Sequence, residues 1–468
     1  MSNKLTRYIS LYGVGVYLLA LGVISMVFHE HVMQTKWILW GIGEVLFFFV
    51  LTTVFYPRWK NNEPKKFWRK VFWVALAIRL FYVVFSYFYF TYTVGYPFEG
   101  SGDALGYYNR SVVLSRCIRR GDFWIVINYL KDYSIGFSDH GYLIWLILLH
   151  TIFGRGVLVA RVFKALMSAY LCIVVYKLVS RTFGERTGRL AAVMCVFMPI
   201  LIQLTGMHIK EMEMIFLSIL ALERMDYLIR SKKYTFWNIL FPILLIGLSF
   251  GFRTVIGMCL IFAFLVFVIF SPSNLVNKKS KIITLSITMA IFLIFLFTAI
   301  GSEMKIIYRL NFSGTDYMAK KYESIGLQHT EITKSKYLFP GAFVLPLSPM
   351  VEESPDHNKM IHGSTYVKNL LAFFAMLAIV IAVRQKKWRD FSLIGAYELS
   401  YLAIIMFTFT SNSERFHEPA IPLILVMAAY AMTHLRHKDL ILFYVYCGLL
   451  FVALFVWNWL KLAARGVV

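Results

Sequence analysis

The segment between residues 100 and 124 combines residue types that can perform acid–base chemistry and bind anions. It reads GSGDALGYYNRSVVLSRCIRRGDFW and directly follows an apolar stretch long enough to cross a membrane. Its acidic residue, Asp103, lies between small residues, and Tyr107 and Tyr108 follow one helical turn later. A carboxylate at a membrane–water boundary can accept a proton from an acceptor hydroxyl. The plainer interpretation is that Asp103 caps the start of a surface helix.

Several arginines follow Asp103 on the same predicted amphipathic helix. They are Arg110, Arg116, Arg119 and Arg120. Guanidinium groups bind phosphate through paired hydrogen bonds, so arginines at this position could hold a lipid-linked phosphate. The segment is therefore our first candidate for a catalytic loop.

Further candidate site residues lie at the ends of other apolar stretches. They are His208, Lys210, Glu211, Arg253, Glu414, Arg415 and His417. Cations near a departing phosphate would stabilise its charge, and Lys210, Arg253 and Arg415 are the candidates for that role. His208 and His417 could assist proton transfer, although a histidine in an outer loop is more often a surface residue.

Each of these residues also has a structural interpretation. Lys210 and Glu211 could form a local ion pair at a helix start. Arg253 could extend its side chain to the outer headgroups. Glu414 and Arg415 belong to the charged run SNSERFHE between two apolar stretches, which predicts a polar cluster at the outer face.

The composition indicates an integral membrane protein. Of the 468 residues, 59% are hydrophobic and 16% are charged, whereas soluble domains carry about a quarter charged residues. The formal net charge is +23, but most Lys and Arg lie in short linkers between apolar stretches. Linkers of this kind orient a membrane protein, so membrane lipids are the expected partners and nucleic acid is not.

We predict an all-α, polytopic transmembrane bundle of about 11–14 spans with juxtamembrane helices on its outer face. The whole chain, 1–468, forms one membrane domain. The candidate spans are 8–29, 37–57, 70–93, 157–180, 188–206, 210–230, 235–252, 254–271, 281–300, 366–384, 391–410, 418–435 and 439–460.

The charge of the linkers predicts the orientation. With the N-terminus in the cytoplasm, the basic linkers all face the cytoplasm, as the positive-inside rule requires. Two long segments, 94–156 and 301–365, then lie outside. The apolar stretch at 140–154 is short for a span, so we expect an interfacial helix on the outer face. Ionisable residues within spans, Glu44, Arg79 and Glu398, predict function or a buried partner.

Five pieces of the chain follow one another in a particular order. They are Asp103-Ala104 with Tyr107-Tyr108 and Arg110, the short helix GYLIWLILLHTIFG, Ala160-Arg161 through RTFGERTGR, Pro199 with TGMHIKE, and ERFHEPAIPLILVMAA. Together these pieces resemble the GT-C superfamily of polytopic glycosyltransferases. The most similar branch is the protein-mannosyltransferase and aminoarabinose-transferase type, the family 39/83-like enzymes. In that superfamily the acidic loop usually follows the first span. Here it follows the third, which implies an extra N-terminal hairpin at 1–69.

The resemblance implies a reaction and a location. A polyprenyl-phosphate-linked sugar would enter from the bilayer, and Asp103 would act as general base on a glycan, lipid or protein acceptor, with inversion at the sugar. The resemblance leaves the sugar, the acceptor and the use of a divalent metal open. We expect a bacterial inner membrane with the active site facing the periplasm. The alternatives are a flippase or transporter for a lipid-linked glycan, and a lipid-linked glycan polymerase.

Overall fold

The computed structural model describes residues 3–131, 140–271, 276, 278–296, 341–352, 359–407 and 414–463, and these residues form helices joined by short loops. The first part contains α1 (Asn3–Val27), η1 (His29–His31), α2 (Thr35–Trp59), α3 (Pro64–Val94), α4 (Gly102–Arg120), α5 (Phe123–Lys131) and α6 (His140–Phe153). The middle part contains α7 (Val157–Phe183), α8 (Glu185–Phe197), α9 (Pro199–Gly206), α10 (Glu211–Ser231), α11 (Phe236–Phe252), α12 (Thr254–Phe270) and α13 (Lys278–Leu296). The last part contains α18 (His362–Arg384), α19 (Ser392–Phe407), α20 (Glu414–His417), η5 (Glu418–Ala420), α21 (Ile421–His434) and α22 (His437–Ala463).

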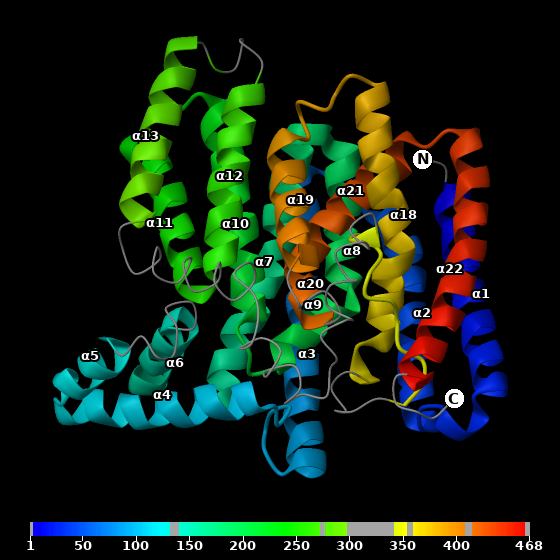
Figure 1. Ribbon diagram of the computed structural model, residues 1–468, viewed down its shortest axis with the longest axis horizontal. Coiled ribbons are helices and arrows are strands. Elements are labelled where there is room, and N and C mark those ends of the chain that lie inside the picture. Colours follow the sequence, from blue (N-terminus) through cyan, green and yellow to red (C-terminus); the bar gives the residue numbers. More distant parts are fainter. Residues whose placement is uncertain are drawn as a thin grey trace.

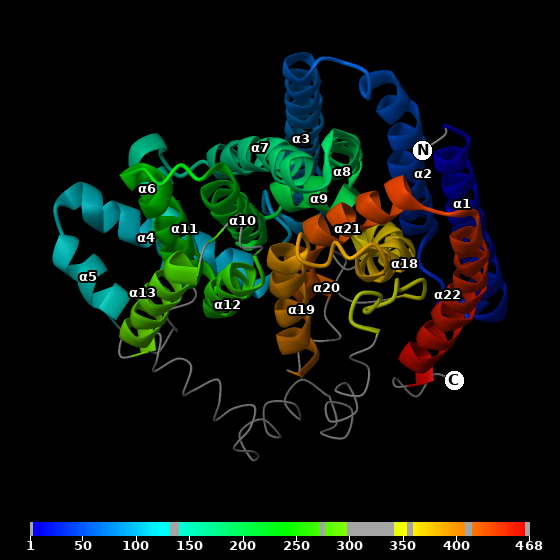
Figure 2. The ribbon, with the colours of Figure 1, turned by 90° about the horizontal axis from the view of Figure 1, so that it is seen from above.

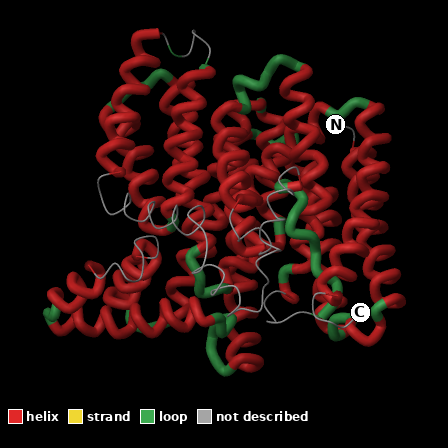
Figure 3. The backbone as a smooth tube through the Cα atoms, in the orientation of Figure 1, coloured by secondary structure: helices red, strands yellow, loops and turns green. Residues whose placement is uncertain are grey.

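The long helices run side by side, and α4 lies across one end of the bundle with α5 and α6 beside it (Figure 1). The same arrangement is visible in the backbone tube, which is helical throughout the bundle (Figure 3). Seen from above, α7, α8, α9, α18 and α21 occupy the centre, α1, α2 and α22 form one side, and α10 to α13 form the other (Figure 2). The prediction of an all-α polytopic bundle is confirmed.

Seven helices of the described part are long and apolar enough to span a membrane. They are Arg7–Val27, Thr35–Trp59, Pro64–Val94, Val157–Phe183, His362–Arg384, Glu414–His434 and His437–Ala463. Shorter apolar helices include α11, α12 and α19. The predicted span at 188–206 is instead a pair of helices, α8 and α9, bent by 46°. Most of the predicted outer segment 301–365 lies outside the described residues.

The bend between α8 and α9 has a local cause and a partner in another helix. Pro199 begins α9 and has no backbone N–H, so it leaves carbonyl groups of the preceding turn without their helical donors. Arg79 of α3 is fully buried and supplies donors, reaching the carbonyl oxygens of Cys195 at 3.1 Å and Val196 at 3.2 Å. Its Nε also donates to Ser168 Oγ at 2.6 Å. The arginine predicted to need a buried partner therefore holds α3, α7 and α8 together.

The predicted N-terminal hairpin, α1 and α2, packs against the C-terminal half of the chain. Tyr366 of α18 donates to the carbonyl oxygen of Gly13 at 2.6 Å. At Gly41 of α2, a Cβ atom would lie 2.1 Å from the His362 ring. Small residues at such crossings let helices approach closely, which is how membrane helices gain packing energy. Glu44, the acid predicted within a span, accepts a hydrogen bond from the Ser364 backbone N–H at 3.0 Å.

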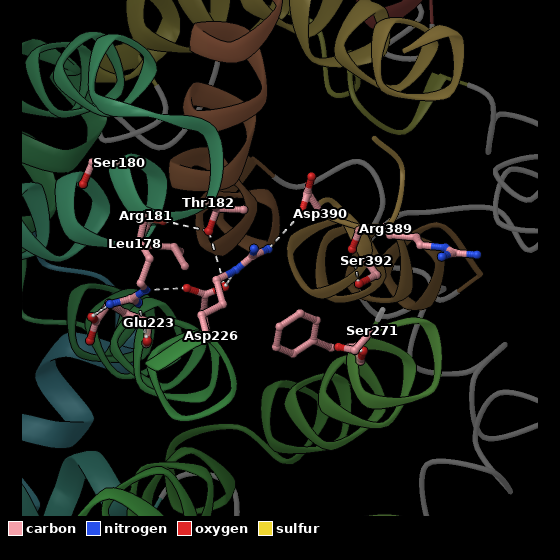
Figure 4. Close-up of polar contacts among 12 residues, drawn as sticks. Leu178, Ser180, Arg181, Thr182, Glu223, Asp226, Ser271, Arg389, Asp390 and Ser392 are labelled. Carbon is pink, nitrogen blue, oxygen red and sulfur yellow. Dashed lines mark hydrogen bonds and ion pairs between the residues drawn. The ribbon is translucent and has the colours of Figure 1, made fainter. Parts of the chain in front are cut away.

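An ion-pair network joins the C-terminal ends of α7 and α10 to the loop before α19 (Figure 4). Arg181 Nε lies 2.6 Å from Asp226 Oδ2, and its Nη1 lies 3.1 Å from Glu223 Oε1. Arg230 bridges Asp226 and Asp390, at 2.7 Å and 3.3 Å. The network brings together residues from linkers that the charge pattern places on the cytoplasmic face.

Candidate active site

Arg415 of α20 connects two carboxylates that come from distant parts of the chain. Its Nη1 lies 2.6 Å from Asp103 Oδ2, and its Nε donates to Glu211 Oε1. The Asp103 side chain is 60% exposed, whereas the Glu211 side chain is only 1% exposed. The guanidinium group therefore links a buried carboxylate to one that remains accessible.

Local sequence determines where these acids lie on their helices. Ser101 is the N-cap of α4, and its side chain accepts the Ala104 backbone N–H at 3.2 Å. The interpretation of Asp103 as the capping residue is therefore wrong. Asp103 lies in the first turn of α4, and Glu211 begins α10. Carboxylates are stabilised at helix N-termini, which carry partial positive charge.

Arg253 lies beside the Arg415 segment, in the extended break between α11 and α12. Its guanidinium carbon is 4.3 Å from the ring centre of Phe416. Among the described residues, its buried Nη1 has no hydrogen-bond partner. Arg253 is thus a cation with hydrogen-bonding capacity left for a ligand.

His208 lies in the loop between α9 and α10 and is enclosed by aromatic rings. The ring centres of Phe98 and Tyr108 are 5.5 Å and 6.0 Å from that of His208. Its backbone N–H donates to Glu99 Oε2 at 2.9 Å, while neither ring nitrogen has a partner in the described part of the chain. Burial, reinforced by the charge of Lys164, lowers the pKa of His208 well below its usual value. Burial raises the pKa of Glu99, although the His208 N–H opposes that shift.

A buried ionic cluster on α7 and α10 supports this loop. Lys164 lies 3.4 Å from Glu213 Oε2 and also donates to the carbonyl oxygen of Ile209. Arg161, one turn earlier on α7, contacts Ser86 Oγ at 3.4 Å. Sequence reasoning did not assign Glu99, Lys164 or Glu213 to the site. For Lys164 and Glu213 the available signal was the presence of ionisable residues within apolar helices, where they are rare, whereas Glu99 lies in the loop between α3 and α4.

The other predicted site residues lie in different surroundings. Tyr107 is buried against Tyr142, with ring centres 4.9 Å apart, while Arg110 is exposed on α4. Lys210 is largely buried immediately before α10. Glu414 and His417 line a small pocket with Lys368 and Glu418. In the ranges that the structure describes, no three His, Cys, Asp or Glu side chains gather as metal ligands.

Comparison with known families agrees with the resemblance in the sequence. Residues 140–299 match the family model described as dolichyl-phosphate-mannose-protein mannosyltransferase. The match covers about a third of the chain. The matched region includes α6, α7, the loop that carries His208, and Glu211 at the start of α10. No curated protein matches the chain.

The chain is also similar to solved structures of an oligosaccharyltransferase from Archaeoglobus fulgidus. One is the archaeal enzyme AglB in complex with an inhibitory peptide and a dolichol-phosphate, with 17% identity and a TM-score of 0.47. That match covers 87% of this chain and 56% of the solved chain. A second, tethered to an acceptor peptide, has 16% identity and a TM-score of 0.46, covering 84% of this chain and 56% of that one. This chain thus spans little more than half the length of these proteins.

Proposed function

We propose that this protein is a GT-C-type glycosyltransferase that moves a sugar from a polyprenyl-phosphate donor to a hydroxyl or amine of a glycan, lipid or protein acceptor. The observation that carries the proposal is the connection of Asp103 to Glu211 through Arg415 at one end of the bundle. Three separate segments converge there, beside a break in the bundle that holds Arg253. Orienting a chain in the membrane does not require such convergence.

Asp103 is the proposed general base. Arg415 holds Oδ2, so the orientation of the carboxylate is set while Oδ1 remains for the acceptor. Its exposure admits an acceptor from the aqueous side. The acceptor oxygen or nitrogen attacks the anomeric carbon, its proton passes to Asp103, and the bond from the sugar to the phosphate oxygen breaks with inversion. The lipid phosphate leaves with the electron pair of that bond.

Arg253 is the best candidate to stabilise the departing phosphate. Arg415 already binds two carboxylates, so little of its charge is left for another anion. Arg253 retains a buried Nη1 without a described partner, and its guanidinium carbon lies 4.3 Å from the ring centre of Phe416. A preorganised donor aimed at developing charge contributes strongly to catalysis in a site that excludes water.

We place the reaction at the outer face of a bacterial inner membrane, towards the periplasm. The support is the positive-inside pattern, because the basic linkers lie at the opposite end of the spans from Asp103. The network around Arg181 and Asp390 belongs to that opposite end.

The direct test is sugar transfer by the purified protein in nanodiscs, with radiolabelled polyprenyl-phosphate sugars and a membrane extract as acceptor. Asp103→Asn should lower transfer by about 10²-fold or more, since it removes the base while preserving shape. Asp122→Asn is the matched control, because it neutralises another exposed acid near α4. Equal rates for wild type and Asp103→Asn would exclude this base. Crossing of the lipid-linked sugar through proteoliposomes without transfer would overturn the enzyme proposal in favour of a flippase.

A further inference from the structure

A second feature of the fold lies on the membrane-facing side of the bundle, between α2, α3 and α9. Here the helices enclose a groove of about 300 Å³. Its lining is mostly apolar, but it includes Glu44, Tyr82 and Gln203. One water takes about 30 Å³ in the liquid, so a single water does not fill this space. Leu39 and Phe81 also line the groove and are 63% and 76% exposed, which opens it towards the lipid.

The polar lining of the groove has unused hydrogen-bonding capacity. The Gln203 amide nitrogen donates to Glu44 Oε1 and, at 2.7 Å, to the Met360 carbonyl oxygen. Both amide hydrogens are therefore used, and this identifies the remaining atom as the carbonyl oxygen. Gln203 Oε1 and the Tyr82 hydroxyl are both buried, and neither has a partner within the described ranges. Buried polar groups without partners are rare, so each calls for an explanation.

These two groups specify the chemistry of a ligand. Gln203 Oε1 can only accept a hydrogen bond, so its partner must be a donor. The Tyr82 hydroxyl can donate or accept. A hydroxyl or a secondary amide satisfies this requirement, whereas ester-linked acyl chains and isoprenoid chains bring no donor at this depth. The apolar rim requires that the same molecule also carries a hydrocarbon chain.

We propose that the groove binds a membrane lipid that carries a hydroxyl or an amide N–H within or next to its apolar portion. Its chain would lie between α2 and α3, and its polar group would reach Gln203 and Tyr82. The inference does not depend on the sugar-transfer reaction, because it rests on the lining of the groove. The groove that would bind this lipid is formed by α2 of the N-terminal hairpin together with α3 and α9.

The groove is close to the candidate active site. At Gly206, which ends α9, a Cβ atom would lie 2.6 Å from the Tyr82 ring and 2.4 Å from Ser86 Oγ. Ser86 in turn contacts Arg161 of the buried cluster. A lipid in the groove would therefore contact Tyr82, which packs against the end of α9 that leads to the His208 loop.

Two photoreactive lipids with one head group and one diazirine acyl chain test the proposal. Sphingomyelin carries an amide N–H and a hydroxyl, whereas phosphatidylcholine carries only esters at these positions. With the full-length protein in nanodiscs, we expect sphingomyelin to label peptides of α2, α3 or α9 about fivefold more than phosphatidylcholine, the ratio expected for one hydrogen bond. Tyr82→Phe removes a single oxygen and should reduce that ratio.

A blocking variant with a matched control completes the test. Gly43 lines the groove, and a Cβ atom there meets nothing within 4 Å, so Gly43→Trp should fill the space and abolish the labelling. Gly15→Trp places the same side chain on α1, where a Cβ atom is equally open, and should leave labelling unchanged. Equal labelling by both lipids, unaffected by Tyr82→Phe, would overturn the proposal. Stronger labelling by a photoreactive polyprenyl phosphate would overturn it as well, by making the carrier lipid the occupant.

Discussion

Arg415 Nη1 lies 2.6 Å from Asp103 Oδ2 across 312 positions of the chain. The same guanidinium holds Glu211, which is buried. Arg415 therefore has two separable roles, because it neutralises a buried acid and it orients an exposed one. We expect the contact with Glu211 to affect stability and the contact with Asp103 to affect transfer activity.

Replacing Arg415 by Met should destabilise the protein and inactivate it. Removing one partner of a buried ion pair costs about 3–5 kcal/mol, and we expect the lower end because the Arg415 side chain is 27% exposed. The double variant Arg415→Met with Glu211→Gln should recover much of the lost stability, since no uncompensated charge remains buried, but not the transfer activity. Thermal unfolding and sugar transfer are the two measurements. Recovery of both in the double variant would contradict the orienting role.

Replacing Arg253 by Gln should lower transfer by about 10²-fold, the effect of losing one preorganised donor to a developing anion. Stability should fall by no more than about 0.5–2 kcal/mol, the loss of the cation–π contact with Phe416, because Arg253 Nη1 has no hydrogen-bond partner among the described groups. Arg155→Gln is the control, since Arg155 is an exposed cation that precedes α7. Comparable losses in both variants would mean that the charge of this face, and not Arg253, matters.

His208 should make folding stability depend on pH. Its pKa is lowered in the folded protein, so the unfolded chain binds the proton more readily below pH 6.5. The stability that neutral His208 contributes is therefore present above pH 6.5 and is lost as the pH falls, by at most about 1.4 kcal/mol per pH unit. His208→Phe keeps an aromatic ring beside Phe98 and should flatten this dependence.

The measurement for His208 is thermal unfolding in detergent between pH 5 and 8. Glu99, whose pKa is raised, changes the free energy of unfolding with pH in the opposite direction. The contribution of His208 is therefore obtained by subtracting the pH profile of His208→Phe from that of the wild type. His29→Phe serves as the control because His29 is exposed, and it should retain the wild-type profile. Identical profiles for wild type and His208→Phe would show that His208 does not titrate in this way.

Arg79→Met should weaken the junction between α3 and α8 and lower the midpoint of thermal unfolding. It leaves buried acceptors at Cys195 and Val196 without donors, and each unsatisfied group costs about 1–3 kcal/mol. Arg69→Met changes an exposed arginine of the same helix and should be nearly neutral. Because α9 leads to the His208 loop, transfer by Arg79→Met should fall even at temperatures where the variant remains folded. Full transfer activity of Arg79→Met at those temperatures would show that the bend between α8 and α9 does not affect the active site.

Much of the fold could be predicted from the pattern of apolar stretches. Every candidate span has a helical counterpart, although α8 and α9 divide one of them. The break at Met198 and Pro199 was visible in the sequence only as a proline, and the pattern did not indicate that Arg79 would hold it. Proline within an apolar stretch is tolerated where neighbouring helices satisfy the freed carbonyl groups.

The candidate site was predicted in part. Asp103, Glu211 and Arg415 were selected separately, as charged residues at outer helix ends, and the structure joins them. Lys164 and Glu213 were not assigned to the site, because the sequence pattern does not show that the two side chains meet. Their pairing at 3.4 Å depends on how α7 lies against α10.

The sequence by itself determined which segments are helices and which ends carry positive charge. The physical reason is that a bilayer offers no partners to backbone polar groups, and a helix satisfies them within a single apolar stretch of about twenty residues. Only the tertiary structure decided which helices are neighbours, and thus that Arg415 meets Asp103, that Arg79 meets the α8–α9 bend, and that Glu44 meets Gln203. Association of helices within a membrane depends on close packing and on hydrogen bonds between particular side chains, and hydropathy contains neither kind of information.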